Sequence, residues 1–181
     1  MADRPILPRP VFPADLFPEG AGLALPGVRF AEGSARGLVH LARPREAGLP
    51  GPWRWAEHDG LVLIALAPGQ WLVEGPEAGL ETEAASRFGG FATDVTDGYV
   101  PFRLSGPLAP AVLARLSSLD YGDEVFSVGA AARTPMMQIG VVIRRLADED
   151  GPAFAMETPR STARDFAHDV RAATISAVSR E

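Results

Sequence analysis

The 181-residue chain contains no cysteine, no lysine and no asparagine, so all 17 of its basic residues are arginine. Without cysteine it cannot form disulfides, thiol nucleophiles, thiolate-held iron–sulfur clusters or CxxC zinc sites. Without lysine it has neither a Schiff-base amine nor the lysine of a phosphate-binding P-loop, and without asparagine it has no N-glycosylation acceptor. These absences exclude much of the chemistry that a chain of this size can perform.

Charge and hydropathy exclude further classes of protein. With a net charge of −6, the chain has no overall attraction for nucleic acid or for an anionic membrane, and we expect neither as a partner. Residues 1–20 contain five prolines and lack the apolar core of a signal peptide. The longest apolar run, at about 60–69, is roughly half of the ~20 residues that a membrane span needs. We therefore expect a soluble, cytoplasmic protein.

Proline divides the chain into two parts. Nine of the 17 prolines lie in residues 1–52, which predicts an extended arm with at most short edge strands near 25–30 and 37–41. The regular pattern of residues 53–181 predicts one α+β domain with mostly antiparallel sheets. The apolar residues between the first prolines either pack on the chain's own core or dock on another chain. They are Ile6, Leu7, Val11, Phe12, Leu16 and Phe17.

The first half of the predicted domain contains two strand pairs and a helix. Residues 60–74 are expected to form a β-hairpin across a Pro-Gly turn. A helix is expected over 78–88, ended by two glycines. Residues 91–95 and 99–105 are expected to form a second strand pair.

The second half is expected to add two helices and three strands. A helix opened by Pro107 is expected to reach about residue 117. Strands at 132–138, 141–147 and 153–158 precede a last helix with Ser161 as its N-cap. The apolar stripe of that helix contains Phe166, Val170, Ala173 and Ala177.

No histidine or carboxylate group assembles a recognisable site. His40, His58 and His168 are scattered, and none has a second ligand at metal-binding spacing. Asp94 and Asp97 are the most suggestive pair. One of them could serve as a general base if it were held away from water. We favour the alternative that Asp97 and the glycine after it close a hairpin turn.

Several arginines could form an anion site if their strands are adjacent. Strand alternation places two of them, Arg144 and Arg145, on opposite faces, which favours salt bridges at an interface or solvation over one shared pocket. The full set is Arg103, Arg133, Arg144, Arg145 and Arg160.

The large apolar residues favour packing over ligand binding. Trp53, Trp55 and Trp71 lack the neighbouring basic stripe of a single-stranded nucleic acid groove, so we expect them in the core or at a protein interface. Of the adjacent Met136 and Met137, one must point inward if they lie in a strand. The residues therefore predict no catalytic, cofactor-binding or metal-binding site, and they favour a binding or scaffolding module.

Five segments nevertheless resemble one known family. VTDGYVPFRLSGP (95–107), followed by APAVLARL (109–116), is similar to the gamma subunit of heterotetrameric sarcosine oxidase. The segments APGQWLV (67–73), RTPMMQIGVVI (133–143) and PRSTA (159–163) follow the same order. The resemblance covers about residues 60–178. Its strand–Ser-Gly-Pro–helix element is shared with the wider aminomethyltransferase (glycine cleavage T-protein) superfamily.

The resemblance implies a folate-binding-domain-like α+β fold without catalysis of its own. In that family the alpha, beta and delta subunits hold NAD, FAD, FMN and zinc, and alpha is thought to handle folate. The complex demethylates sarcosine to glycine and passes the carbon to tetrahydrofolate or releases it as formaldehyde. The resemblance therefore implies partners of these three kinds and no cofactor bound by this chain.

Two points keep alternatives open. Where the family has a Cys-Pro-like segment, this chain has SSLD (117–120), so the parent complex could act on another N-methylated or secondary amine. A stand-alone folate-binding or aminomethyltransferase-like protein, with Asp94, Asp97 or Arg103 near a pterin, is the alternative function. The chain is about half as long as a full aminomethyltransferase, which argues against a complete folate enzyme.

Overall fold

Two antiparallel sheets form the centre of the molecule in a computed structural model that describes residues 22–34, 36–43, 48–148 and 151–179. The six-stranded sheet has the order β1-β2-β8-β11-β10-β9 and the five-stranded sheet the order β4-β5-β6-β3-β7. The strands of the first are β1 (Leu23–Leu25), β2 (Val28–Glu32), β8 (Tyr99–Ser105), β9 (Ala131–Met136), β10 (Ile139–Leu146) and β11 (Ala153–Pro159). Those of the second are β3 (Gly37–Ala42), β4 (Trp55–His58), β5 (Leu61–Ala67), β6 (Gln70–Gly75) and β7 (Phe91–Asp94).

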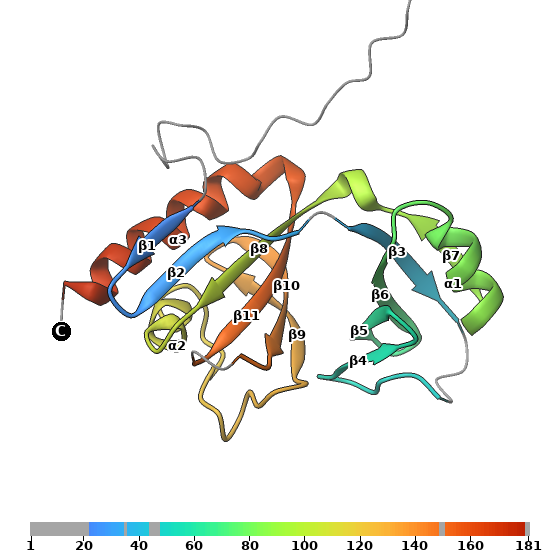
Figure 1. The fold of residues 1–181 in the computed structure, drawn as a ribbon, viewed down its shortest axis with the longest axis horizontal. Helices are drawn as coiled ribbons and strands as arrows, with labels where there is room; N and C mark the ends of the chain where they lie inside the picture. Colours follow the sequence, from blue (N-terminus) through green and yellow to red (C-terminus); the bar gives the residue numbers. More distant parts are fainter. Residues whose placement is uncertain (1–21, 35, 44–47, 149–150, 180–181) are drawn as a thin grey trace, which may run out of the picture.

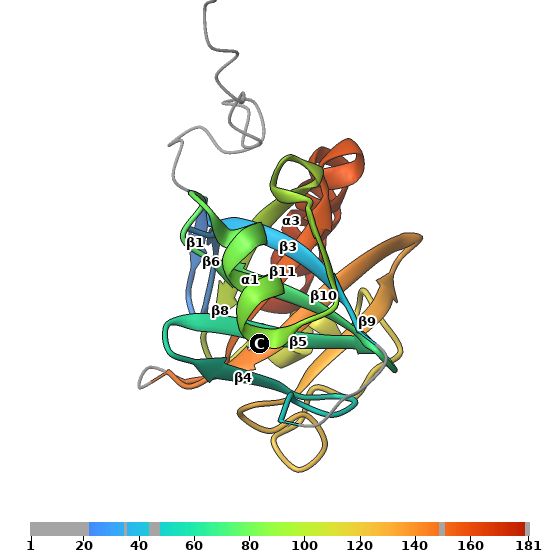
Figure 2. The same cartoon turned by 90° about the vertical axis from the view of Figure 1, so that its right-hand side faces the viewer.

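Helices cover the outer face of each sheet. The helices α2 (Ala109–Leu113) and α3 (Ala163–Val178) lie on the six-stranded sheet, and α1 (Leu80–Phe88) lies on the five-stranded one (Figure 1). Two 3₁₀ turns, η1 (Thr96–Gly98) and η2 (Arg160–Thr162), precede β8 and α3. The inner faces of the two sheets meet each other, and Figure 2 shows α1 in front of the strands of the five-stranded sheet, on its outer side. This arrangement confirms the predicted α+β class.

Strand alternation explains why each sheet serves two cores. Along β6, Trp71 and Val73 face α1, whereas Leu72 and Glu74 face the other sheet. The cluster between the sheets is small: it contains Leu38, Val62, Ile64, Leu72, Ala131 and Val142. The largest core lies between the six-stranded sheet and α2 and α3, where the rings of Phe102 and Phe166 have centroids 5.6 Å apart.

The predicted hairpin, α1 and the three late strands are confirmed, but the second strand pair is wrong. β7 pairs with β3 in one sheet, and β8 pairs with β2 and β11 in the other. The chain crosses between the sheets at η1, where the Leu38 N–H donates to Thr96 Oγ1 at 2.9 Å. Because the chain crosses here, β7 and β8 bury their side chains in different cores. A hairpin formed by β7 and β8 would place both strands in one sheet.

The predicted edge strands before residue 52 are also wrong in their position. β2 lies between β1 and β8, and β3 lies between β6 and β7. Both β2 and β3 pair with strands that are distant in the sequence. The proline content of residues 1–52 does not reveal such pairing. The apolar residues 6–17 lie outside the described residues, and the boundary after residue 52 stays a prediction.

The two predicted late helices begin or end differently. The helix after Pro107 spans only Ala109–Leu113, although Leu116 beyond it is still buried. Ser161 is not the N-cap of α3, because η2 carries the chain to Thr162, which makes no side-chain capping bond. The predicted stripe of α3 is confirmed, since Phe166, Val170, Ala173 and Ala177 are all buried. None of the described helices is long and apolar enough to cross a bilayer.

Gly106, which leads from β8 to α2, is expected to be intolerant of a side chain. Its φ is +112°, and a Cβ there would lie 2.5 Å from the carbonyl oxygen of Gly27. We expect Gly106→Ala to lower the free energy of unfolding by about 2–3 kcal/mol, measured by urea denaturation. Gly140→Ala is the matched control, because nothing lies within 4 Å of its Cβ position. Equal stabilities of the two variants would contradict this account of the turn.

Candidate functional site

Three charged side chains are buried where the inner faces of the two sheets meet. Glu74 on β6, Arg144 on β10 and Glu157 on β11 have exposed fractions of 7%, 8% and 4%. They belong to the inner faces by alternation, since Glu74 is paired in register with Leu38 and Glu157 with Val142. Charged residues are rarely this buried unless they are paired, so their contacts decide what the cluster can do.

Arg144 is held between a carboxylate and an aromatic ring. Its Nη2 forms an ion pair with Glu74 Oε2, and its guanidinium carbon lies 5.4 Å from the centre of the Trp55 ring. The indole N–H of Trp55 donates to the carbonyl oxygen of Arg145 at 2.9 Å, which fixes the ring. Glu74 has a second cation nearby, because Arg36 Nη1 lies 3.4 Å from its Oε1. Glu74 is therefore the shared anion of two arginines.

Glu157 has no such compensation. Its Oε2 has no hydrogen-bond partner among the described residues. Burial, followed by the negative charge of Glu74, raises the pKa of Glu157 to about 8, and Arg144 offsets only part of this shift. At neutral pH the Glu157 side chain is therefore mostly an uncharged carboxylic acid.

A hollow of about 130 Å³ adjoins this cluster. Buried Leu38, Glu74 and Glu157 line it together with exposed residues nearer the surface. The exposed residues are Ser34, Arg36, Glu77, Asp97 and Arg160. The hollow can hold a few water molecules or one small ligand, and it brings the unpartnered carboxyl group of Glu157 close to the surface.

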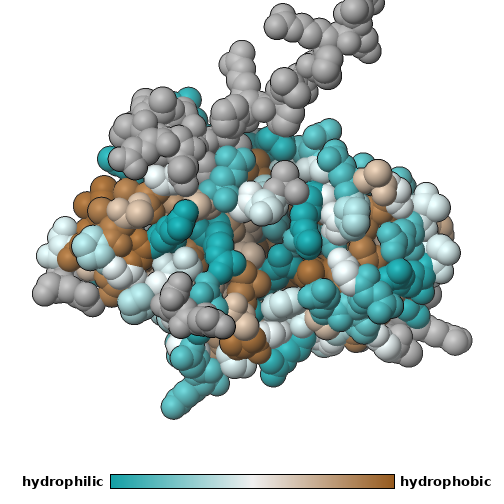
Figure 3. All heavy atoms as spheres, viewed as in Figure 1, coloured by the Kyte–Doolittle hydropathy of each residue, from teal (hydrophilic) through white to brown (hydrophobic). Residues whose placement is uncertain are grey.

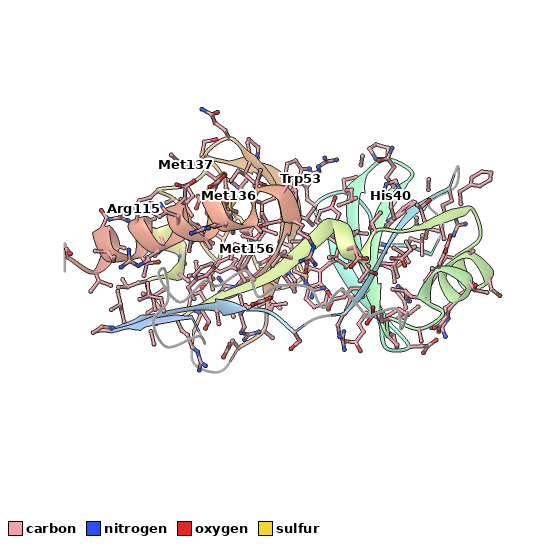
Figure 4. The ribbon with its side chains drawn as sticks, turned by 90° about the horizontal axis from the view of Figure 1, so that it is seen from above. His40, Trp53, Arg115, Met136, Met137 and Met156 are labelled. Carbon is pink, nitrogen blue, oxygen red and sulfur yellow. The ribbon has the colours of Figure 1, made fainter. Side chains whose placement is uncertain are left out.

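The histidines and the aspartate pair form no catalytic arrangement. The part of the chain that the structure describes contains no group of three His, Cys, Asp or Glu residues that could hold a metal ion. His168 is exposed on α3, and His40 lies in β3 (Figure 4). Asp94 is exposed, and its carboxylate accepts the Thr96 N–H at 2.9 Å, which lowers the pKa of Asp94. The pair therefore belongs to a turn, but to the crossing between sheets rather than to the predicted hairpin.

The five arginines do not converge on one pocket. As alternation predicted, Arg144 and Arg145 lie on opposite faces. Arg145 contacts Asp123 at 2.7 Å and lies 4.8 Å from the centre of the Phe154 ring. Arg103 pairs with Asp148 and lines a separate open hollow beside β1 and β2. Arg103, Arg144 and Arg145 form salt bridges within the chain, and salt bridges at an interface stay a prediction.

Apolar side chains are exposed on the loops beside the junction of the sheets. Trp53 is 63% exposed, with a φ of +63°, and lines a groove of about 280 Å³ together with Leu66 and Pro68. The backbone next to it bonds to the loop that carries exposed Val128, through Trp55 N–H and the Gly129 oxygen at 3.1 Å. Figure 4 shows Trp53 between the two halves of the molecule. Trp71, by contrast, lies in the core.

The two adjacent methionines and the apolar surface near β1 and α3 bear on the expected burial of large apolar residues. Met136 is fully buried and Met137 is 59% exposed, so one of the two methionines points inward, as expected. Apolar atoms also gather at the end of the molecule where β1 and α3 lie (Figure 3), and Ile175 of α3 is 42% exposed there. Exposed apolar groups of this kind favour contacts with other proteins.

Glu74 and Glu157 were missed as candidate residues from the sequence. The available signal was a single carboxylate inside an apolar strand, in WLVEG (71–75) and AFAMETP (153–159). Such a residue can lie at the surface, at the end of a strand, or it can be a buried polar group. The two cases differ in whether another sheet packs over the residue, which the sequence pattern does not reveal.

Comparisons with known proteins give a consistent picture. No family model matches the sequence. A sarcosine oxidase subunit gamma from Arthrobacter sp is 33% identical over 130 residues, which are 68% of this chain and 63% of the relative's length.

Solved structures agree with this relationship at the level of the fold. A chain of the heterotetrameric sarcosine oxidase from Corynebacterium sp. U-96, solved in complex with pyrrole 2-carboxylate, superposes with a TM-score of 0.76. It is 20% identical, and the match covers 87% of this chain and 89% of that one. The glycine cleavage system aminomethyltransferase T from Bartonella henselae superposes with a TM-score of 0.57 at 19% identity, over 80% of this chain and 45% of that one. By sequence the chain is similar to a sarcosine oxidase gamma subunit, as its motifs predicted. By fold it is similar to a chain of heterotetrameric sarcosine oxidase and to aminomethyltransferase T.

Proposed function

We propose that the chain is the gamma-type subunit of a heterotetrameric sarcosine oxidase-type complex and acts by assembling with larger subunits. The identity with a gamma subunit over 130 residues carries the proposal. The exposed tryptophan and the apolar groove beside it supply a surface for assembly. The buried ion pair between Arg144 of β10 and Glu74 of β6 joins the two sheets of the chain itself.

The cofactors follow from the same proposal. The alpha, beta and delta subunits would hold FAD, FMN, NAD, zinc and tetrahydrofolate, and this chain would bind none of them. The complex would convert sarcosine, or a related N-methylated amine, to its demethylated product in the cytoplasm.

Purification of the tagged full chain from its native cells tests this function. We expect larger subunits to co-purify, with visible flavin absorbance and sarcosine-dependent production of hydrogen peroxide. The isolated chain should show neither property. Flavin bound stoichiometrically to the isolated chain, or a chain that purifies alone from cells with sarcosine oxidase activity, would contradict the proposal.

Replacement of Trp53 tests the surface. We expect Trp53→Gly to weaken association with the larger subunits about 30-fold, the effect of losing one aromatic anchor worth about 2 kcal/mol. The isolated variant should keep its unfolding free energy within about 1 kcal/mol, because glycine adopts the positive φ of this position without strain. His168→Ala, on exposed α3, is the control and should assemble normally. Normal assembly of the Trp53 variant would exclude this surface as the interface.

The alternative, a stand-alone folate protein, is favoured by the superposition on aminomethyltransferase T. The three residues considered for a pterin site do not meet, however. Asp97 lines the hollow between the sheets, Asp94 is exposed, and Arg103 lines the separate hollow beside β1. Calorimetric titration of the chain with tetrahydrofolate distinguishes the two functions. A micromolar Kd, which corresponds to a binding free energy of about −8 kcal/mol, would support the alternative. We expect no such binding.

A further inference from the structure

The hollow between the sheets has the features of a binding site that the proposed function does not use. Its inner wall holds Glu157, which is more than nine-tenths buried and whose Oε2 has no partner among the described residues. Glu74, the second buried carboxylate, lines the same space. A buried carboxylate oxygen without a hydrogen-bond donor is energetically costly, and more so when the group is charged. A ligand that supplies N–H donors and positive charge would remove that cost.

We propose that this hollow binds an alkylammonium group, with the carboxylates of Glu157 and Glu74 accepting hydrogen bonds from its nitrogen. Two carboxylates suit a nitrogen with two or three N–H donors. The described residues include no group of three His, Cys, Asp or Glu side chains that could hold a metal ion instead. Leu38, Tyr99 and Pro101 also line the hollow and offer apolar surface that fits methyl or methylene groups. The volume of about 130 Å³ limits the ligand to a few heavy atoms.

The charges around the hollow favour a cation. When Glu157 is ionised, four carboxylates stand against three arginines: Glu74, Glu77, Asp97 and Glu157 line the hollow with Arg36 and Arg160, and Arg144 acts on Glu157 from β10. Both lining arginines have partners: Arg36 lies against Glu74, and Arg160 donates to the carbonyl oxygens of Asp97 and Tyr99 at 2.7 and 3.2 Å. No arginine is paired with Glu157 among the described residues. The chain contains no lysine, so an alkylammonium side chain must come from another molecule.

Dimethylammonium chloride is the probe, titrated into the isolated full chain by calorimetry between pH 6 and pH 9. Because the ligand binds the ionised form of Glu157, we expect its apparent Kd to tighten about tenfold from pH 6 to pH 7 and to level off above pH 8. Tetramethylammonium chloride at the same ionic strength has the charge but no N–H donor, and it should bind at least tenfold more weakly.

Two variants distinguish binding in the hollow from nonspecific attraction of the cation to the negatively charged chain. Glu157→Gln keeps the shape of the side chain and should abolish binding and its pH dependence. Glu81→Gln, on the exposed face of α1 and outside the hollow, should bind like the native chain. Equal affinity of native chain and Glu157→Gln, equal affinity for the two ammonium ions, or no measurable binding at pH 9 would overturn the proposal.

The assembled complex distinguishes two sources of the ammonium group. If the complex also binds dimethylammonium, the natural ligand is a free small amine. If binding is lost on assembly and returns on dissociation, a lysine side chain of a partner subunit fills the hollow. The site proposal does not depend on the proposed function, because its first test uses the isolated chain and the function is tested by co-purification.

Discussion

Replacing Arg144 with methionine is expected to lower the free energy of unfolding by about 3–5 kcal/mol, because the change leaves a buried carboxylate unpaired. Arg144 is the buried cation of the cluster: it pairs with Glu74 and lies against the Trp55 ring. Arg36, the other cation near Glu74, is exposed and lies 3.4 Å away, so it offers weaker compensation. Methionine has a similar length and adapts to the space, which limits the loss of packing. Urea denaturation at pH 7 measures the change.

The control and the double variant identify the cause. Arg133→Met, on the exposed side of β9, should change stability by no more than about 0.5 kcal/mol. Glu74→Gln combined with Arg144→Met should recover much of the loss, since removal of both charges leaves neither member of this ion pair buried without its partner. A double variant as unstable as the sum of its single changes would show that packing, and not charge, explains the effect of Arg144.

The stability of the chain is expected to fall as pH rises from about 4.5 to about 8, through the ionisation of Glu157. The pKa of this carboxyl is about 8 in the folded chain and near its ordinary value of 4.5 when unfolded. The folded state therefore binds more protons in this interval, and the free energy of unfolding decreases with pH. The stabilisation from the protonated form is complete below about pH 4.5 and lost by about pH 8. Its upper limit is about 5 kcal/mol.

Glu157→Gln isolates this contribution from the other carboxylates. The difference in unfolding free energy between the native chain and the variant should decrease steadily between pH 5 and pH 8 and stay constant above it. The groups that line the hollow with Glu157 are Arg36, Glu74, Glu77, Asp97, Tyr99 and Arg160, and Arg144 acts on it from β10. Glu77→Gln, at the exposed mouth, should leave the pH dependence unchanged. A flat difference for Glu157→Gln would mean that water reaches this side chain in the folded state.

These two expectations concern the junction of the sheets, where the cluster between them is small and partly polar. The junction depends on a few charged contacts as well as on apolar packing. A proton, or the alkylammonium group proposed above, acts on the same side chain, Glu157. Conditions that change the charge of Glu157 should therefore change the stability of the packing between the two sheets.

The sequence by itself determined the excluded chemistry, the class of fold and the relationship. The absence of cysteine and lysine needs no structure, and the stripe of α3 and the Pro-Gly hairpin follow from local periodicity. The ordered segments between residues 67 and 163 pointed to the gamma subunit family, and the comparisons support it. Each of these depends on residues close together in the chain or on composition.

Only the tertiary structure decided which strands share a sheet and which charges share a space. β7 and β8 are separated by one short turn but lie in different sheets, because their partners β3 and β11 come from distant parts of the chain. Glu74 and Glu157 are 83 positions apart in the numbering, and each reads alone as an isolated carboxylate in a strand. They meet because alternation turns both toward the same junction, and their burial there sets the charge of Glu157. Local sequence specifies the faces of a strand, and the packing of sheet on sheet decides what those faces meet.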